Sequence, residues 1–422
     1  MHISGYRFSL IITTLLLCMW IIGGCASNAA SPAQIGSRVT SSDAASSEQT
    51  DSQTFSQDVA DSAITDYHAS SWAAMEPTGH MPLDYATEFA VDYYDDLALI
   101  TIGGTDRYLL IPENAKAPAD LNTDIIPIRK PDTIYLAASA GMDYFRVLKA
   151  LDTVRMTSTQ AVNWSLPEVV QALDSEKMLY AGKYSAPDYE LLLREGIDLA
   201  IESTMIYHTP ETKEKIEKLG IPVLVDKSSY EPHPLGRMEW IKLYGLLLDK
   251  TDEADAFYNE QLASLAAVPE LSKMLSSQDS PTVAYFYITS SGYANVRRPG
   301  DYISKMIEMA GGSYAFADAS VSEDSAKATM NMQMEAFLDR ALLSDILIYS
   351  TSIDGELHSA EELYKKAPML KQSKAASAGN IWITDKNMYQ QTTAVAEMML
   401  ELHSVITGNA DEDELIFLHK LK

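Results

Sequence analysis

Two adjacent arginines, Arg297 and Arg298, are the residues whose type and position best indicate a chemistry. The chain around them is strongly acidic, with 59 Asp and Glu against 32 Lys and Arg and a formal charge of −27. Arginine presents several N–H donors in a planar fork that matches the oxygens of carboxylates and phosphates. Cations clustered on such an acidic body indicate a site for an anionic ligand. The alternative is that both arginines pair with nearby Asp and Glu side chains.

The elements that would position these residues are read from hydrophobic patterning. From Thr133 onward, short apolar runs alternate with segments of helical spacing, which is typical of parallel sheets built from βαβ units. Ligands of such sheets bind beyond the carboxyl ends of the strands. Polar and aromatic residues in or near the loops that follow the predicted strands are therefore the ligand-binding candidates. They are Ser139, Thr159, Lys183, Tyr207, His208, Tyr230, His233, Arg237, Tyr293, Arg297, Arg298, Thr351 and Tyr389.

The tyrosines of this set could offer stacking faces or hydrogen bonds. A bare metal ion would need several histidines together with a carboxylate. Of the eight histidines only His208 and His233 fall in suitable loops, with Glu202, Glu231 and Glu239 around them. A single histidine near a helix start more often caps or packs, so we expect no metal site, and a zinc or manganese receptor stays an alternative.

The patterning predicts an α/β protein of two lobes, each with a mainly parallel sheet flanked by helices and with a ligand cleft between them. Residues 83–234 form the predicted N-terminal lobe and 279–422 the C-terminal lobe. A helical connector, 235–278, joins them through helices at Leu235–Leu248 and Asp252–Ala267. Residues 87–94, 97–102 and 108–111 are predicted to form a small antiparallel meander.

The N-terminus indicates export. Arg7 and an apolar run, Phe8–Ile22, precede two glycines and Cys25, and a polar, low-complexity stretch follows. This arrangement is that of a secretory signal, and the run is shorter than the ~20 residues that span a bilayer. With Cys25 first in the mature chain, it resembles the lipobox of bacterial lipoproteins, which implies lipidation of that thiol. We expect a signal peptide at 1–24, a flexible tether at 25–82 and a protein anchored to the cell membrane outside the cytoplasm.

Four segments carry a resemblance over about 133–407. They are 180–190 (YAGKYSAPDYE), 202–207 (ESTMIY), 230–240 (YEPHPLGRMEW) and 300–312 (GDYISKMIEMAGG). A pattern also recurs once per half: a helix led by a glutamate, Glu190 or Glu335, runs into a buried strand. Together these residues resemble the substrate-binding lipoproteins of bacterial ABC importers, in the class that includes the ferric-siderophore and vitamin B12 binding proteins.

The resemblance implies a receptor that hands a small ligand to a two-subunit permease driven by a cytoplasmic ATPase. In that class one exposed carboxylate per lobe docks on permease arginines, and the matching residues are Glu190 and Glu335. Solvated glutamates favoured by the helix dipole are the alternative. An anionic site in such a receptor suits a ferric siderophore, and cobalamin or haem is the alternative ligand.

Other functional classes are disfavoured. The net charge repels nucleic acid and lipid headgroups, so we expect membrane contact through the lipid anchor only, and a monomer. The sequence has no G-x-S-x-G, P-loop, H-E-x-x-H or dinucleotide fingerprint, so we expect no enzyme and no cofactor, with a secreted hydrolase as the remaining alternative.

Overall fold

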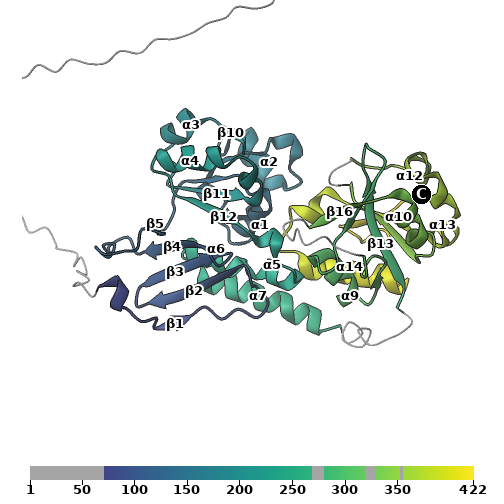
Figure 1. The fold of residues 1–422 in the computed structure, drawn as a ribbon, viewed down its shortest axis with the longest axis horizontal. Coiled ribbons are helices and arrows are strands. Elements are labelled where there is room, and N and C mark those ends of the chain that lie inside the picture. The colour runs from purple at the N-terminus through teal and green to yellow at the C-terminus, as the bar shows by residue number, and fades with distance from the viewer. Residues whose placement is uncertain (1–70, 269–279, 320–327, 352–354) are drawn as a thin grey trace, which may run out of the picture. The chain divides into compact units, whose positions relative to one another are not determined.

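The computed structural model describes residues 71–268, 280–319, 328–351 and 355–422. The predicted signal peptide, Cys25, most of the predicted tether and the end of the predicted connector lie outside the described residues. Figure 1 shows the described elements with their labels.

The first lobe is built on a five-stranded sheet of order β12-β11-β6-β7-β8, in which all neighbouring strands are parallel. Its strands are β6 (Ile134–Leu136), β7 (Val154–Thr157), β8 (Leu179–Tyr180), β11 (Leu199–Ser203) and β12 (Val223–Asp226). Its helices are α1 (Met142–Val147), α2 (Pro167–Asp174), α3 (Tyr189–Arg194) and α4 (Pro210–Lys218), with a hairpin of β9 (Gly182–Lys183) and β10 (Ala186–Pro187). Leu192 of α3 and Ile216 of α4 are buried in one core with Ala200 and Val223 of the sheet.

The predicted meander is present and is larger than the sequence indicated. A separate sheet of order β1-β2-β3-β4-β5 contains β1 (Gly79–His80), β2 (Phe89–Tyr94), β3 (Leu97–Ile102), β4 (Asp106–Ile111) and β5 (Ile125–Arg129). The β1 to β4 pairs are antiparallel, and β5 joins β4 in parallel. Ordered structure begins before residue 83, because Trp72 is buried beside Leu97 and Leu109 on one face of this sheet.

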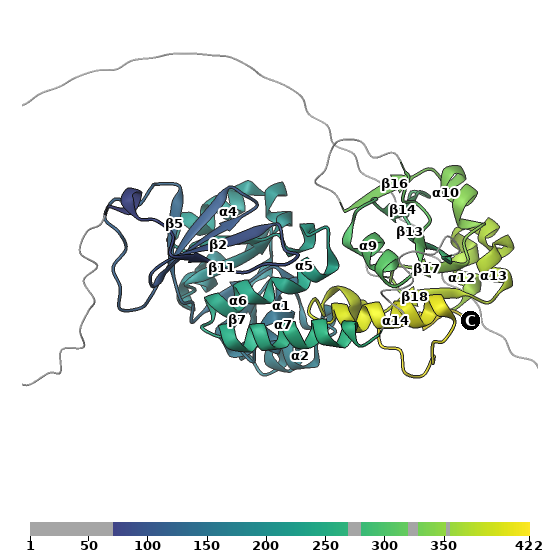
Figure 2. The same cartoon turned by 90° about the horizontal axis from the view of Figure 1, so that it is seen from below.

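The connector contains α5 (Pro234–Glu239), α6 (Ile241–Leu247) and α7 (Thr251–Ala266). Patterning predicted one helix over Leu235–Leu248, but it is divided at Trp240. Trp240 is fully buried with its ring edge against Phe89 of β2, at 5.0 Å between ring centroids. Figure 2 shows α6 and α7 running along the same side of the first lobe.

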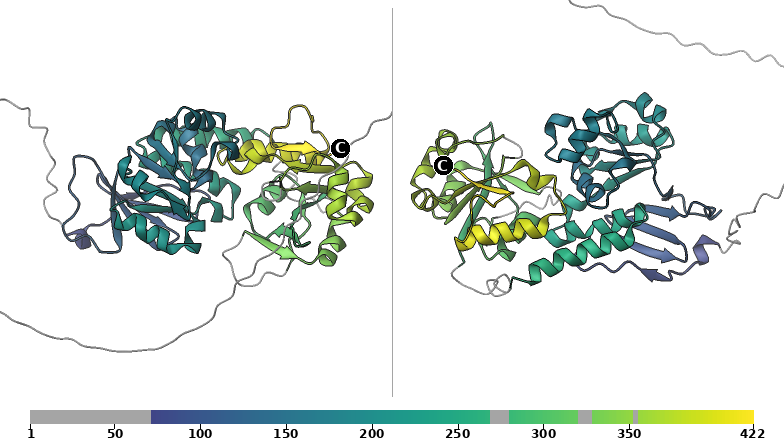
Figure 3. Two further views of the ribbon diagram at one scale, coloured as in Figure 1. Left: turned by 90° about the horizontal axis from the view of Figure 1, so that it is seen from above. Right: turned by 180° about the vertical axis from the view of Figure 1, so that it is seen from behind.

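The second lobe has its own seven-stranded sheet with the path β16-β14-β13-β17-β18-β19 and with β15 beside β13. The strands are β13 (Thr282–Ile288), β14 (Ala294–Arg297), β15 (Ser313–Tyr314), β16 (Thr329–Met332), β17 (Ile346–Tyr349), β18 (Ile381–Thr384) and β19 (Leu418–Lys420). The helices are α9 (Tyr302–Met309), α10 (Met334–Ala341), α12 (Ala360–Lys366), α13 (Lys374–Ser377) and α14 (Val395–Thr407). The α14 helix packs against α7 and α9 (Figure 3).

The predicted fold class is confirmed: two lobes carry separate sheets flanked by helices, and a helical segment joins them. The central strands β13, β17 and β18 of the second sheet are parallel, whereas β14, β16 and β19 pair antiparallel at its edges. Within the described ranges, no helix combines the length and apolar character needed to cross a bilayer.

Candidate functional site

The first-lobe candidates lie near the carboxyl ends of the parallel strands, as patterning predicted. Ser139 follows β6, Thr159 follows β7, Tyr207 and His208 follow β11, and Tyr230 follows β12. Register pairs Ile201 of β11 with Leu136 of β6, so these loops leave the sheet at one edge. Lys183 lies apart from them, exposed on the β9–β10 hairpin.

Tyr207 and Tyr230 form an exposed aromatic patch with a cation beside it. The ammonium of Lys227 lies 5.8 Å from the Tyr207 ring centroid, within the range of a cation–π contact. Burial, followed by the charges of Asp106 and Tyr230, raises the pKa of Tyr207 to about 12. Asp106 belongs to the meander, which therefore borders this edge of the first lobe.

His233 has a structural position. Its Nδ1 accepts the backbone N–H of Leu235 at 3.2 Å and caps α5, and its ring stacks on Tyr85 at 4.5 Å. Burial lowers its pKa, and the positive charge of Lys305 lowers it further. Glu231 and Glu239, the two glutamates near His233, also form hydrogen bonds within the protein.

Glu231 and Glu239 anchor the loop before the meander. The Glu239 carboxylate accepts the N–H groups of Asp84, Tyr85 and Ala86 at 2.8–3.1 Å. Glu231 accepts those of Thr87 and Glu88 and the indole N–H of Trp240. Buried carboxylates satisfied in this way have little capacity left for a metal ion. Among the described residues, no group of three or more His, Cys, Asp or Glu is arranged to hold one.

The second lobe assembles a largely buried cluster around Arg297, which we call the arginine–tyrosine cluster. Its members are Arg237, Arg297, Tyr285, Tyr302 and Tyr389. Arg297 Nη2 donates to the Tyr389 hydroxyl at 3.1 Å, and its Nη1 lies 3.6 Å from an Asp301 oxygen. Its guanidinium also lies 5.6–5.8 Å from the ring centroids of all three tyrosines. Arg297 thus pairs with a nearby carboxylate, which was the alternative to ligand binding, and it also contacts the three tyrosine rings.

Arg237 enters the same cluster from α5 of the connector. Its guanidinium carbon lies 4.6 Å from the centroid of the Tyr302 ring, which Arg297 also contacts. The side chain is buried, yet its Nη2 makes only a long hydrogen bond of 3.5 Å to the Thr392 hydroxyl. Its Nε has no partner among the described residues. A buried guanidinium with unused donors is costly unless an acceptor reaches it. This is the strongest local indication of an anionic ligand.

The electrostatics of the cluster favour an ionised oxygen at Tyr389. Burial opposes ionisation of this phenol, but the positive charge of Arg297 and hydrogen bonds with Ser350 and Tyr285 outweigh it and lower the pKa of Tyr389. Tyr285, its hydrogen-bond partner, has its pKa raised well above the usual value, chiefly by burial. The cluster therefore contains one tyrosine prepared to carry negative charge and one that stays neutral.

The other second-lobe candidates are placed differently. Tyr293 is exposed in the turn between β13 and β14, and Arg298 follows β14, where its backbone N–H bonds to Ala328. Thr351 is buried, and its hydroxyl donates to the Thr384 carbonyl at 2.6 Å. We expected Arg297 in a loop over 290–298, but it ends strand β14, which pairs with β13 through Phe286 and Val296.

Sequence reasoning missed several members of the cluster. Tyr285 lies within strand β13, not in a loop that follows a strand. Asp301 is the N-cap of α9, and Tyr302 is the first residue of that helix. Asp301 caps this helix by accepting the N–H of Ile303 at 3.0 Å. An Asp before a helical run is a recognisable N-cap signal, so the start of α9 was predictable, although the contact with Arg297 was not.

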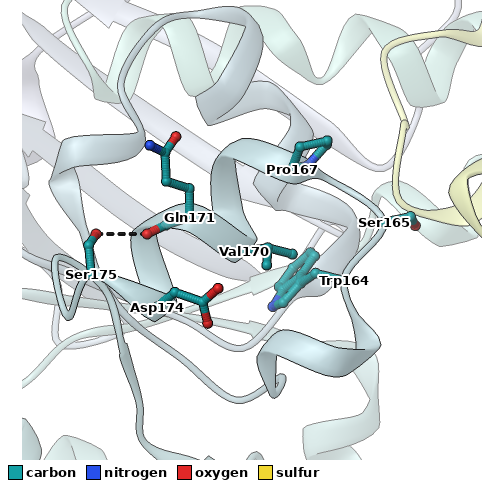
Figure 4. A pocket seen from close by; sticks show the side chains of 7 residues that line it. All are labelled: Trp164, Ser165, Pro167, Val170, Gln171, Asp174 and Ser175. Carbon is teal, nitrogen blue, oxygen red and sulfur yellow. Dashed lines mark hydrogen bonds between the residues drawn. The ribbon is translucent and has the colours of Figure 1, made fainter.

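A small cavity borders one of the ligand-binding candidates, and a larger cavity in the first lobe does not. One, of about 20 Å³, borders Arg297, Tyr285 and Ser350 and is large enough for roughly one water molecule. The other, of about 500 Å³, lies along α2 in the first lobe and is walled by Trp164, Pro167 and Val170, with Asp174 beside them (Figure 4).

Glu202, one of the three glutamates that the sequence offered beside His208 and His233, is a buried carboxyl group. It lies in β11, and neither of its oxygens has a hydrogen-bond partner among the described residues. Burial alone raises its pKa to about 8, so it is mostly neutral at pH 7.

The two glutamates of the repeated pattern occupy equivalent local positions. Glu190 lies in the first turn of α3, which precedes β11, and Glu335 lies in the first turn of α10, which precedes β17. Both side chains are exposed.

Comparisons with known proteins agree with this architecture. Residues 138–388 match the family model described as periplasmic binding protein. An uncharacterized lipoprotein of Methanocaldococcus jannaschii is 23% identical over 329 residues, which cover 75% of this chain and 80% of the relative.

Solved structures share the fold. A periplasmic heme binding protein from Pseudomonas aeruginosa aligns with a TM-score of 0.55 and 15% identity, covering 69% of this chain and 98% of that one. The petrobactin-binding protein YclQ from Bacillus subtilis aligns with a TM-score of 0.52 and 15% identity, covering 66% and 93%. At such identities the likeness concerns the fold. Because the family model spans more than half of the chain, this protein belongs to the periplasmic binding protein family, which confirms the family predicted from its sequence.

Proposed function

We propose that this protein is the extracytoplasmic binding lipoprotein of an ABC importer and that it captures an anionic chelate, a ferric siderophore. The observation that carries the proposal is the convergence of Arg237 and Arg297 on the Tyr302 ring, with unused donors on Arg237. The buried guanidinium of Arg237 and the largely buried one of Arg297 lie together on a chain whose formal charge is −27. Oxygen anions of a chelate would satisfy them bidentately.

Binding of ferric chelates tests this proposal. We expect one class among ferric catecholate, hydroxamate and carboxylate complexes to quench tryptophan fluorescence saturably. Arg237→Gln and Arg297→Gln should each weaken that binding at least tenfold, because each removes charge-assisted hydrogen bonds. Arg340→Gln is the matched control, since Arg340 lies in the same lobe and bonds to Asp318 and Ala315 away from the cluster. Equal affinities for all four proteins would contradict the proposed site.

A second candidate ligand, haem, is favoured by Tyr389. Its lowered pKa makes a phenolate accessible, and tyrosine is a known axial ligand of haem iron. One of the structural relatives is named as a heme binding protein. Titration with haemin distinguishes the ligands: a haem receptor gives a shifted Soret band that Tyr389→Phe abolishes, whereas a siderophore receptor gives no saturable Soret change.

Delivery to a permease is proposed to use Glu190 and Glu335. Each is an exposed acid at the start of a helix, one in each lobe, and two separated ion pairs would fix the orientation of a transient complex. In reconstituted vesicles, Glu190→Lys and Glu335→Lys should reduce transport while leaving chelate affinity unchanged. Glu211→Lys is the control, because Glu211 is an equally exposed acid in the first turn of α4. Undiminished transport by both variants would exclude this role.

Membrane attachment is proposed to occur through Cys25. The support is the sequence before it and the naming of a relative as a lipoprotein. A lipid-modified chain should partition into detergent, and Cys25→Ser should release it to the aqueous phase. Detergent partitioning that the Cys25→Ser substitution leaves unchanged would point to another kind of anchor.

A further inference from the structure

The segment Tyr389–Thr393, which we call the strap, runs from the arginine–tyrosine cluster to the first lobe. Its first residue, Tyr389, closes the short helix Lys386–Tyr389 and bonds to Arg297. Its next residue, Gln390, leaves the cluster and contacts residues more than 220 positions away in the chain. The strap is therefore a direct covalent link between the candidate ligand site and an inter-lobe contact.

Gln390 uses both ends of its amide group on the first lobe. Its Oε1 accepts the backbone N–H and the hydroxyl of Ser165, both at 2.7 Å, and its Nε2 donates to the Asn163 carbonyl at 2.8 Å. Ser165 precedes α2 and lies beside the C-terminal segment of the chain in Figure 4. Three bonds from one half-buried side chain are directional, and water can replace them when the lobes separate.

Thr392 and Thr393, the last residues of the strap, form buried hydrogen bonds that are harder to break than those of Gln390. Thr393 donates from its backbone N–H to Asp143 Oδ2 at 2.9 Å and from its hydroxyl to the same oxygen at 2.5 Å, and Thr392 donates to the Ala140 carbonyl at 2.8 Å. All three of Asp143, Thr392 and Thr393 are buried. Breaking these contacts would leave buried polar groups without partners, which is costly. The strap thus has a fixed end at Thr393 and a solvent-accessible end at Gln390.

We infer that Gln390 is a positioning residue that couples ligand contact at Tyr389 to the first lobe, and this inference rests on the proposed function. A ligand that engages the Tyr389 hydroxyl holds the end of the Lys386–Tyr389 helix and, through it, the adjacent Gln390. The bonds to Ser165 and Asn163 then keep the lobes together while the ligand is bound. The free protein already makes these bonds, so they limit the separation of the lobes before binding, and ligand contact at Tyr389 reinforces them. Their loss should therefore act mainly on the dissociation rate.

The free protein provides the first test. Spin labels at Lys218→Cys and Glu361→Cys, both exposed, report the distance between the lobes in the full chain with Cys18 and Cys25 replaced by serine. Gln390→Ala should broaden this distance distribution. Gln372→Ala is the matched control, because Gln372 is exposed in the same lobe and its side chain donates to Met369 of its own turn. An unchanged distribution in Gln390→Ala, or equal broadening in the control, overturns the inference.

The second test measures rates with the ferric chelate that binds the unmodified protein best. Gln390→Ala should raise the dissociation rate about tenfold and change the association rate less than twofold, with thermal stability retained. Ser165→Ala removes one of the same bonds, so combining it with Gln390→Ala should add almost nothing. A chelate that leaves Gln390→Ala no faster than the unmodified protein overturns the coupling.

The two tests separate the inference from the proposed function. The distance measurement uses no ligand, so failure of every chelate to bind would overturn the proposed ligand and the coupling of Gln390 to it, whatever the distances show. Saturable binding that Arg297→Gln weakens, together with an unchanged dissociation rate in Gln390→Ala, would retain the proposed function and overturn the role of Gln390.

Discussion

Arg297 donates a hydrogen bond to the hydroxyl of Tyr389, 92 residues further along the chain, and the two side chains meet inside the second lobe. The sequence made both residues ligand-binding candidates but did not pair them, since Arg297 ends strand β14 and Tyr389 ends a short helix. Their contact places a partly buried phenol beside a guanidinium, whose positive charge lowers the pKa of that phenol. The chemical character of the candidate site derives mainly from this pair.

Titration of Tyr389 should report this pair directly. The pKa of Tyr389 is lowered, so its phenolate stabilises the fold fully only above the ordinary pKa of about 10, and that contribution is lost as the pH falls through the lowered value. An ultraviolet titration should show one tyrosine ionising before the others, absent in Tyr389→Phe and shifted upward in Arg297→Gln. Tyr293→Phe, which alters an exposed ring, is the control. An early-titrating tyrosine that survives in Tyr389→Phe would contradict the assignment.

Glu202 should lower stability as the pH rises. Its pKa is raised by burial from 4.5 to about 8, so the folded state binds a proton that the unfolded state releases between these values. Stability should therefore fall from pH 4.5 to about 8 and level off above. Near pH 7.5, Glu202→Gln should be more stable than the unmodified protein by about 4 kcal/mol, because roughly three pH units above 4.5 are each worth ~1.4 kcal/mol. Denaturant unfolding at several pH values measures this, with the exposed Glu190→Gln as control. Parallel pH profiles for the unmodified protein and Glu202→Gln would refute the burial argument.

Glu239 should stabilise the attachment of the meander. Glu239→Gln weakens the cradle, which is the set of hydrogen bonds that the Glu239 carboxylate accepts from the backbone amides of residues 84–86. It also leaves the buried Lys242 ammonium without its carboxylate partner at 2.9 Å. Loss of one partner of such a pair costs about 3–5 kcal/mol, measurable as a shift in the urea midpoint. The control is Glu217→Gln, which breaks a half-exposed pair with Lys213 and should cost below ~1 kcal/mol. Similar midpoints for both variants would show that the cradle contributes little.

The effect of Glu239 should also depend on pH in the opposite sense to that of Glu202. Burial opposes its ionisation, but Lys242 and the backbone amides lower its pKa below 4.5 overall. Its stabilisation is present above pH 4.5 and is lost as the pH falls through the lowered value. The stability difference between the unmodified protein and Glu239→Gln should therefore shrink in acid, and a constant difference down to low pH would contradict this account.

Gly236 should be intolerant of a side chain. A Cβ at this position would lie 2.7 Å from the Tyr85 carbonyl oxygen and 3.2 Å from the Ala86 Cα, in the loop that Glu239 holds. Gly236→Ala must displace backbone rather than a flexible side chain, so we expect a loss of about 1–3 kcal/mol in unfolding free energy. Gly79→Ala is a suitable control, since its nearest neighbour would be 4.0 Å away. Wild-type stability in Gly236→Ala would mean that the loop can move away at little cost.

The sequence by itself determined the order and type of most elements. Strand β3, Leu97–Ile102, has the predicted bounds, because a short apolar run between turn residues marks a strand directly. The family was also determined by the sequence, since its motifs lie in contiguous stretches. The predicted helix over Leu235–Leu248 failed at Trp240, whose burial against Phe89 depends on a sheet that is distant in the chain.

Only the tertiary structure decided which candidate residues meet. Arg237, Arg297 and Tyr389 were predicted from position alone, whereas Tyr285, Asp301 and Tyr302 joined them because strand pairing and helix packing brought distant segments together. It also engages the side chains of Glu231, Glu239 and His233 as hydrogen-bond acceptors for backbone amides, which their sequence positions did not reveal. Local periodicity records which way a side chain faces, but contacts between segments depend on the packing free energy of the whole fold, which a single sequence pattern does not contain.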